Sequence, residues 1–294
     1  MERKILVAHI PHGVNAEHFY KVTSTEDLKK LEEMRLRMFK GQVVDFAALV
    51  NNRNIRRKAI PDIVLAFRYF ILMLPKEKAE RCRLILHTQP SDVNGTDIAA
   101  VLQEVAPEVK AIFSETKVAS YDLNLIYNIA DVVVNGGTNE GFGISNLEAL
   151  MAERLVIANV TGGLQDQLGF VDEEGKYLDE DVHFTKEWGS NHDGKYRMHG
   201  EWAFPVFPNN KSLQGSPPTP FIFDDRWSQE EMAQQFKAIY DMPKEERERR
   251  GKLGRKYALT HGFDVHEMAR RFIVGIDKVF ETWKPIDLWE VYKA

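Results

Sequence analysis

Short runs of apolar residues alternate along residues 43–160 with longer segments in which apolar residues recur every three or four positions. The short runs predict buried strands and the longer segments predict helices. Strands that alternate with helices are typical of βαβ units and of a parallel sheet. The pattern therefore predicts an α/β fold with a doubly wound parallel sheet, its strands at residues 43–50, 83–87, 110–114, 131–134 and 155–160.

The helix predicted after the first strand has Pro61 near its start, where a missing N–H has no intrahelical partner to lose. Its apolar side chains recur at helical spacing, at Ile63, Val64, Phe67, Phe70, Ile71 and Leu74. Near the end of the chain, three more helices are predicted at residues 228–240, 243–259 and 265–283. Ser228 is a suitable N-cap for the first of them.

Residues 172–225 interrupt this alternation with five prolines and scattered aromatic residues, among them Trp188, Trp202 and Phe204. A structureless loop of that length is uncommon in a compact domain, so an ordered excursion or a mobile flap is expected, and the aromatic residues favour order. The predicted organisation is a linker-like segment at 1–42, one domain at 43–283 that contains this insertion, and a tail at 284–294.

The charge and composition of the 294 residues exclude several classes of partner. The chain has 39 basic and 44 acidic residues, a formal net charge of −5, so no general field would hold a nucleic acid. No apolar stretch approaches the roughly 18 residues of a membrane span, so no integral membrane segment is expected. A single cysteine, Cys82, permits no intramolecular disulfide and favours a reducing compartment, the cytoplasm.

The segment NGGTNEGFGISNLEAL contains two glutamates, Glu140 and Glu148, on either side of a Gly-Phe-Gly turn. If a helix begins near Gly143, then Ile144, Leu147 and Met151 form one apolar stripe, and Glu148 falls within it, about 40° from Ile144. The neighbours of Glu148 at helical spacing include no Lys or Arg. Because an unpaired buried carboxylate is costly, Glu148 predicts a polar ligand, such as ribose hydroxyls, or a distant base.

The loop before this helix is suited to an anionic ligand. Gly141 and Gly143 let backbone N–H groups approach a ligand closely at the positive end of the helix, next to Glu140. The alternative is a plain tight turn with solvated glutamates, and that would be the better interpretation of a lone Gly-x-Gly. The unusual place of Glu148 favours the ligand site.

Four basic residues, Arg53, Arg56, Arg57 and Lys58, follow the first predicted strand within six positions. Such runs are usually solvated surfaces. Here the next helix begins just beyond Lys58, and its dipole disfavours nearby cations by roughly 0.3–1 kcal/mol each. A diphosphate at the carboxyl ends of the strands would supply the missing anion, and the Glu140 loop emerges at the same edge.

Two further features were weighed. The loop Thr161-Gly162-Gly163 leaves the last predicted strand, and a plain turn and a binding role are equally open for it. The nine histidines show no zinc-ligand spacing, and the acidic residues at 179–181 are typical of a surface loop, so no metal site is predicted.

Together these segments resemble the C-terminal, nucleotide-sugar-binding domain of family 4 retaining glycosyltransferases of the GT-B type. The shared features are the spacing of Arg53 and Lys58, the glutamates 140 and 148 around Gly-Phe-Gly, the preceding LIYNIADVVV and the Gly162-Gly163 loop. The resemblance covers residues 43–169 well and the terminal helices more loosely. It implies a single Rossmann-like domain of the GT-B C-terminal type.

The resemblance also implies roles for individual residues. Arg53 and Lys58 would hold the donor diphosphate and stabilise the leaving group without a metal. Glu148 would hold the ribose. Glu140, as the residue nearest the reacting carbon, would position the transferred sugar together with Gly141, Phe142, Gly143 and Ile144. The donor would be a UDP- or GDP-linked sugar, with no further cofactor, and Lys117 and Val118 are candidates for base contacts.

The chain departs from the family pattern at its start. Residues 9–15, HIPHGVN, look like the family's interdomain connector, so the acceptor-binding domain that usually precedes it is expected to be missing, as in a fragment, a misread start, a split enzyme or a binding protein descended from the enzyme. The favoured hypothesis is a glycosyltransferase donor module that is active with a separate acceptor-binding polypeptide. The alternative is a noncatalytic nucleotide-sugar-binding or partner-binding module. A nicotinamide-dependent oxidoreductase is disfavoured because no Gly-x-Gly-x-x-Gly follows a strand.

Overall fold

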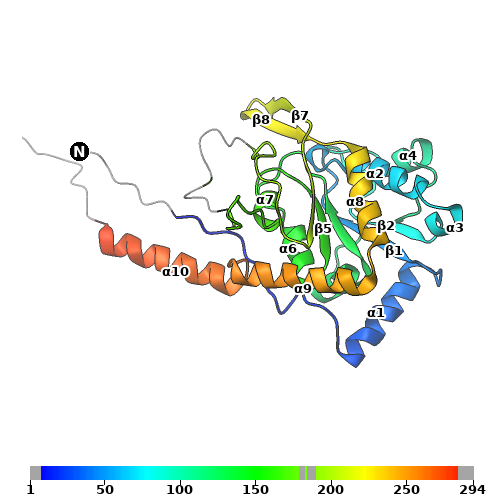
Figure 1. Ribbon diagram of the computed structural model, residues 1–294, viewed down its shortest axis with the longest axis horizontal. Coiled ribbons are helices and arrows are strands. Elements are labelled where there is room, and N and C mark those ends of the chain that lie inside the picture. Colours follow the sequence, from blue (N-terminus) through cyan, green and yellow to red (C-terminus); the bar gives the residue numbers. More distant parts are fainter. Residues whose placement is uncertain (1–7, 179–182, 184–189, 284–294) are drawn as a thin grey trace, which may run out of the picture.

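The computed structural model describes residues 8–178, 183 and 190–283 and contains one six-stranded sheet with helices packed around it (Figure 1). All six strands are parallel, in the order β3-β2-β1-β4-β5-β6. This is the strand order of a Rossmann-like doubly wound sheet, so the predicted fold class is confirmed. The strands are β1 (Phe46–Asn51), β2 (Cys82–His87), β3 (Ala111–Phe113), β4 (Val132–Asn135), β5 (Leu155–Asn159) and β6 (Ala203–Val206).

The first five strands lie where the apolar runs predicted them, within a few residues at each end. Strands β1, β2, β4 and β5 are continuous apolar runs because helices cover both faces of the sheet. The central residues of β1 and β4, such as Leu49 and Val133, are fully buried. These strands supply the core that holds the loops at the carboxyl edge of the sheet in place.

Helix α2 (Ile60–Leu72) follows β1 through a short 3₁₀ turn, η1 (Arg56–Lys58). The predicted apolar face of α2 is confirmed, because Ile63, Val64, Phe67, Phe70 and Ile71 are all buried. It packs against α8 (Gln229–Asp241), while α6 (Ile144–Met151) packs against α9 (Lys244–Thr260). The remaining helices are α3 (Lys76–Ala79), α4 (Ile98–Glu104), α5 (Ser120–Ile129), α7 (Leu164–Gln167) and α10 (Val265–Thr282).

The N-terminal segment is more structured than the linker-like prediction for residues 1–42. It contains helix α1 (Thr25–Met38), which Ser24 caps by accepting a hydrogen bond from the N–H of Asp27 and which packs on α5. Before α1, the chain is held by Val14, which pairs with Asp264, and by Val22, which donates to the side chain of Asn128. The helix carries five large apolar residues at positions 28, 31, 34, 36 and 38, of which only Met34 is buried.

Residues 172–225, predicted as one insertion, are divided by the structure into two different parts. Strand β6 pairs in parallel with β5 and belongs to the central sheet, as its buried residues Ala203 and Val206 show. Pro205 is tolerated there because β6 is an edge strand. Strands β7 (Asn210–Ser216) and β8 (Thr219–Arg226) form a separate antiparallel hairpin. The expectation of order is confirmed for this described part.

Two sequence predictions lie outside the described residues, namely the tail at 284–294 and the acidic run at 179–181. Within the described ranges, no helix combines the length and the apolar character that crossing a membrane requires.

Candidate functional site

The order of the strands places two loops together at the carboxyl edge of the sheet. Strands β1 and β4 are neighbours, yet β1 continues to β2 on one side and β4 continues to β5 on the other. The order in which successive strands are added to the sheet therefore reverses between β1 and β4. In open α/β sheets, ligands bind at this point. The segment after β1 carries the basic run, and the segment after β4 carries Glu140.

A buried ion pair joins these two loops. The ammonium of Lys58 contacts Oε2 of Glu140, and both side chains are at most 10% exposed. The guanidinium of Arg57 lies 3.2 Å from the same carboxylate oxygen. The site thus has two cations around one carboxylate, an arrangement that is able to bind further negative charge.

The burial of Lys58 affects its charge. Burial lowers the pKa of the Lys58 ammonium, and the hydrogen bond to Glu140 opposes that effect. The next residue, Ala59, has φ of 49°, in the left-handed region that is strained for a residue with a side chain. This backbone turn sets the direction of the chain between η1 and α2.

Backbone contacts fix the two loops relative to each other. The carbonyl of Arg57 accepts a hydrogen bond of 2.7 Å from the N–H of Thr138, and the guanidinium of Arg57 donates to the carbonyl of Asn139. The base of the hairpin joins this network, since the N–H of Asp225 donates to the carbonyl of Thr138. The position of Glu140 is therefore determined by three segments distant in sequence.

Glu148, on α6, faces the end of β1 and pairs with no base among the residues that the structure describes. It accepts a 2.6 Å hydrogen bond from the hydroxyl of Tyr127, and the amide of Asn51, the last residue of β1, lies 3.4 Å from the same oxygen. Burial raises the pKa of Glu148 to about 7, and the Tyr127 hydrogen bond only partly opposes it. The expectation of a half-buried carboxylate without an adjacent cation is confirmed.

The start of α6 has unoccupied backbone donors. Gly143 is in the left-handed region at φ of 85° and precedes the first residue of the helix, which begins where it was predicted. In the described part of the chain, the N–H groups of residues 141–144 donate to no protein acceptor. They lie at the positive end of the helix, where an anion is stabilised.

One prediction about this helix is wrong. Ile144 was assigned to the buried stripe with Leu147 and Met151, but it is 52% exposed, whereas the other two are fully buried. The periodicity of the sequence does not reveal which side of the first turn of α6 is covered, and the side that carries Ile144 is left exposed. Phe142, just before the helix, is half-buried and lies edge-on to His12 with 5.1 Å between ring centres.

The loop of Gly162 and Gly163 packs against the Glu140 loop. The N–H of Gly163 donates to the carbonyl of Glu140 at 3.1 Å, and the N–H of Gly162 donates to the carbonyl of Ser190 at 2.7 Å. A Cβ atom on Gly162 would collide with the carbonyl of Glu140. Both N–H groups are already used, so this geometry favours support of the Glu140 loop over direct donation to a ligand.

Arg53 does not join the cluster at Glu140. Its guanidinium pairs with Asp92 at 2.9 Å, and the Arg53 side chain is 64% exposed. Exposed pairs of this kind contribute only about 0–1 kcal/mol, so Arg53 is free to exchange Asp92 for another anion. Of the two bases singled out from the sequence, the structure brings Lys58 but not Arg53 to Glu140.

The structure also identifies residues that the sequence interpretation left without a role. Arg57 was part of the basic run, and Tyr127 was part of the LIYNIADVVV segment, but spacing alone does not show that their side chains reach Glu140 and Glu148. Lys117, proposed for base contacts, is exposed on the loop after β3, and Val118 is partly buried. No cluster of three or more potential metal ligands occurs among the residues that the structure describes.

A comparison with protein families matches residues 108–172 to the family described as "Glycosyl transferases group 1". The matched segment contains α5, β4, the Glu140 loop, α6, β5 and the loop of Gly162 and Gly163. The part of the site with the two glutamates thus lies within the segment that matches this family.

Among curated proteins, the alpha-monoglucosyldiacylglycerol synthase of Acholeplasma laidlawii is 28% identical over 151 residues. That alignment covers 50% of this chain and 34% of the synthase. The chain therefore spans about a third of this relative's length.

Solved structures resemble the chain over nearly its whole length. The sucrose-phosphate synthase of Thermosynechococcus elongatus superposes with a TM-score of 0.62 at 20% identity, over 93% of this chain and 53% of that one. Anabaena Alr3699/HepE, solved in complex with UDP-glucose, superposes with a TM-score of 0.61 at 14% identity, over 90% of this chain and 56% of that one. At these identities the likeness establishes the fold, and this chain corresponds to about half of each protein.

Proposed function

We propose that this chain is the donor-binding part of a retaining GT-B-type glycosyltransferase. It binds a sugar linked to a nucleoside diphosphate, and the sugar is then transferred to an acceptor. The observation that carries the proposal is the cluster of Lys58, Arg57 and Glu140 between β1 and β4, where the strand order reverses. Glu148 of α6 faces the end of β1 next to this cluster. The match of residues 108–172 to the glycosyltransferase family supports it.

The diphosphate lies across the basic loop in this proposal. Lys58 supplies a point charge next to the leaving group, and Arg53 leaves the exposed contact with Asp92 to bind a phosphate oxygen. When the bond between the anomeric carbon and the diphosphate breaks, negative charge grows on the leaving oxygen, and these cations stabilise it. Arg57 keeps Glu140 neutralised while Lys58 is engaged with the diphosphate.

The nucleoside and the sugar lie on either side of the diphosphate. The carboxylate of Glu148 accepts hydrogen bonds from the ribose hydroxyls, because it has no cation as a partner among the described residues. The free N–H groups of residues 141–144 and the carboxylate of Glu140 position the sugar, and Gly162 with Gly163 holds that loop in place. The nucleotide is UDP or GDP, and the complex with UDP-glucose of a protein of similar fold favours UDP.

The acceptor is held by another domain or polypeptide. The chain corresponds to only 53% and 56% of the two solved proteins, and the remaining half of a GT-B enzyme is the part that binds the acceptor. In the complete assembly, the oxygen of the acceptor hydroxyl bonds to the anomeric carbon on the face that the diphosphate leaves, and the hydroxyl proton passes to the departing diphosphate oxygen. The buried, free thiol of Cys82 is consistent with a cytoplasmic location.

Calorimetric titration with UDP, GDP and their glucose conjugates tests the proposal directly. We expect at least one of them to bind the wild-type chain, and Lys58→Ala to weaken that binding at least about tenfold, equivalent to ~1.4 kcal/mol. The exposed Lys78, on the short helix α3, provides the matched control Lys78→Ala, which should bind as the wild type does. Equal binding by Lys58→Ala and the wild type would refute the diphosphate site.

Activity distinguishes the enzyme from a binding module. Transfer should occur when the chain is combined with an acceptor-binding domain or polypeptide. Nucleotide-sugar binding without transfer in any such combination would instead favour the noncatalytic alternative.

A further inference from the structure

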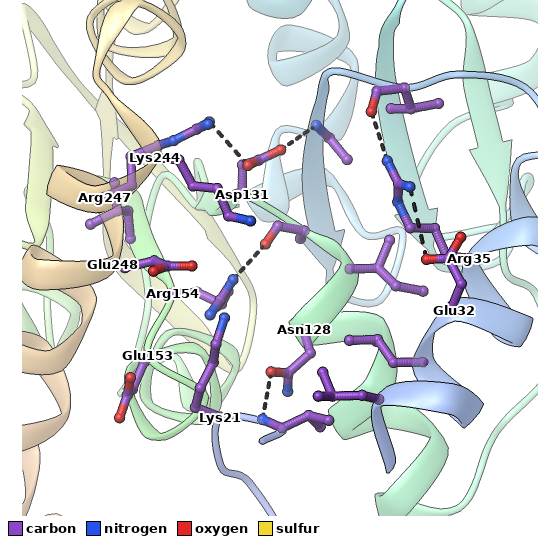
Figure 2. A pocket seen from close by; sticks show the side chains of 18 of the residues that line it. Lys21, Glu32, Arg35, Asn128, Asp131, Glu153, Arg154, Lys244, Arg247 and Glu248 are labelled. Carbon is purple, nitrogen blue, oxygen red and sulfur yellow. Dashed lines mark hydrogen bonds and ion pairs between the residues drawn. The ribbon is translucent and has the colours of Figure 1, made fainter. Parts of the chain in front are cut away.

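A cavity of about 530 Å³ opens at the amino edge of the sheet, opposite the cluster of Lys58 and Glu140 (Figure 2). It lies between α1, the beginnings of β1, β4 and β5, and the first turn of α9. One strand length, roughly 15 Å, separates it from the carboxyl edge. It adjoins a second hollow of about 480 Å³ that shares Lys21 and Arg154 with it. Its volume is within the range of about 300–1,000 Å³ that is typical of small-molecule sites.

The wall of this cavity has an apolar side and a charged side. Leu28 and Leu31 of α1 and Ile129 of α5 belong to the apolar side. Leu28 is 46% exposed, which is unusual for a large apolar side chain that faces an interior hollow. Figure 2 shows the labelled charged side chains of residues 153–154 and of α9 on the other side of the cavity, facing α1.

Five of the ten charged residues that line the cavity have identifiable ion-pair partners. Arg247 pairs with Asp131 at 3.0 Å, and Arg35 lies 4.0 Å from Glu32. Asp45 pairs outside the cavity with Arg81, at 3.6 Å. These groups are therefore neutralised without any ligand.

Two cations that project into the cavity are different. In the part of the chain that the structure describes, neither Lys21 nor Arg154 forms an ion pair with a carboxylate.

Arg154 donates two hydrogen bonds to backbone carbonyls. Its Nε lies 3.0 Å from the oxygen of Ala152, and one terminal nitrogen lies 3.3 Å from the oxygen of Ala130. These neutral acceptors fix the direction of the guanidinium, and the carboxylates of Asp131, Glu153 and Glu248 attract its charge from beyond pairing distance.

The two cations repel each other. Burial lowers the pKa of Lys21 to about 8, and the charge of Arg154 is the next cause. Lys244 lowers this pKa further, while Glu248 and Glu153 raise it without reaching pairing distance. Two like charges held together in a half-buried hollow destabilise the unoccupied protein, and an anion between them would reverse that effect.

We propose that this cavity binds a small organic anion, a phosphate or carboxylate carried on an apolar body. Its charged group lies between Lys21 and Arg154, and its apolar body lies against Leu28 and Leu31. The geometry that carries the inference is the pair of cations without an ion-pair partner among the described residues on one wall, and Leu28 and Leu31 of α1 on the other. The site is separate from the proposed donor site and does not depend on the proposed function.

Hexyl phosphate is a suitable probe because it combines both features, and inorganic phosphate and hexan-1-ol each have only one. Calorimetric titration of the wild-type chain should show that hexyl phosphate binds at least about tenfold more tightly than either of the others. Hexanoate in place of hexyl phosphate distinguishes a carboxylate site from a phosphate site. No binding of hexyl phosphate or hexanoate at millimolar concentration would overturn the proposal.

The variant Lys21→Met removes one cation and keeps the length of the side chain. It should weaken binding of the preferred probe at least about tenfold and raise the thermal midpoint of the unliganded chain, because the repulsion of Arg154 is gone. A variant that is merely misfolded would lower that midpoint. Lys29→Met, on an exposed position of α1 outside the cavity, is the matched control and should bind normally.

A second variant determines which site the probe occupies. Lys58→Ala should bind hexyl phosphate as the wild type does, although it loses nucleotide affinity. If Lys58→Ala loses the probe and Lys21→Met keeps it, the anion binds at the carboxyl edge and the proposed cavity site is wrong. Failure of nucleotide binding with intact probe binding would refute the proposed function and leave this site standing.

Discussion

Lys58 and Glu140 lie 82 positions apart in the chain, yet their side chains form a buried ion pair between the loops that follow β1 and β4. The contact exists because β1 and β4 are neighbours in the sheet, and the order of the strands reverses between them. Arg57 shares the same carboxylate oxygen, so Glu140 remains paired when either base moves. The pair therefore links the stability of the fold to the proposed donor site.

Removal of the Lys58 charge should destabilise the unliganded chain. In Lys58→Met, Glu140 stays buried with only Arg57 as a partner, and we expect the free energy of unfolding to fall by about 2 kcal/mol, below the full cost of breaking a buried pair. The double variant Lys58→Met/Glu140→Gln should recover at least about 1 kcal/mol of this loss. Urea denaturation of the single and double variants measures both values, and strictly additive effects would show that the pair does not couple.

The stability of the chain should depend on Glu148 between pH 4.5 and 7. Its folded-state pKa is about 7, raised from the ordinary value of 4.5, so the folded chain holds the proton more strongly than the unfolded chain does. The resulting stabilisation is fully present below pH 4.5 and is lost as the pH rises through 7, by up to about 3 kcal/mol. Glu148→Gln should remove this dependence in denaturation curves at pH 5 and pH 8. An unchanged slope in the variant would assign the effect to other groups.

The exposed contact between Arg53 and Asp92 should compete with nucleotide binding. If Arg53 must leave Asp92 to bind the diphosphate, then Asp92→Asn should strengthen nucleotide binding by about two- to fivefold, while Arg53→Ala weakens it. Both variants should change the free energy of unfolding by less than about 1 kcal/mol, since the pair is solvent-exposed. Titration of both variants with the same nucleotide is the measurement, and unchanged affinity in both would remove Arg53 from the site.

The two glycines with positive φ at 162 and 175 permit a matched comparison. Each has a backbone that strains an alanine, with φ of 44° and 79°, but only Gly162 faces another segment, the carbonyl of Glu140, at a distance that excludes a Cβ atom. Gly162→Ala should therefore displace the Glu140 loop and weaken nucleotide-sugar binding at least about tenfold. Gly175→Ala has nothing within 4 Å of its Cβ and should show only the strain, as a lower thermal midpoint with normal binding.

The sequence was sufficient to predict five of the six strands of the central sheet and to single out both glutamates. Strands β1, β2, β4 and β5 are mostly apolar because both faces of the sheet are covered, and such runs are visible without coordinates. Glu148 stood out because a carboxylate interrupts an apolar helical stripe without a base at helical spacing. Both signals are local, and for that reason one sequence was enough to find them.

Only the tertiary structure decided which side chains meet. Arg57 rather than Arg53 reaches Glu140, because the 3₁₀ turn at residues 56–58 directs it there, and Ile144 is 52% exposed although the other residues of the first turn of α6 are buried. Strand β6 is too short and too proline-rich to be recognised until it pairs with β5. The cavity between α1 and the amino edge brings Lys21 and Arg154 together from positions 133 residues apart. Such relationships depend on how distant segments pack, and a one-dimensional pattern of apolar and polar residues does not contain that information.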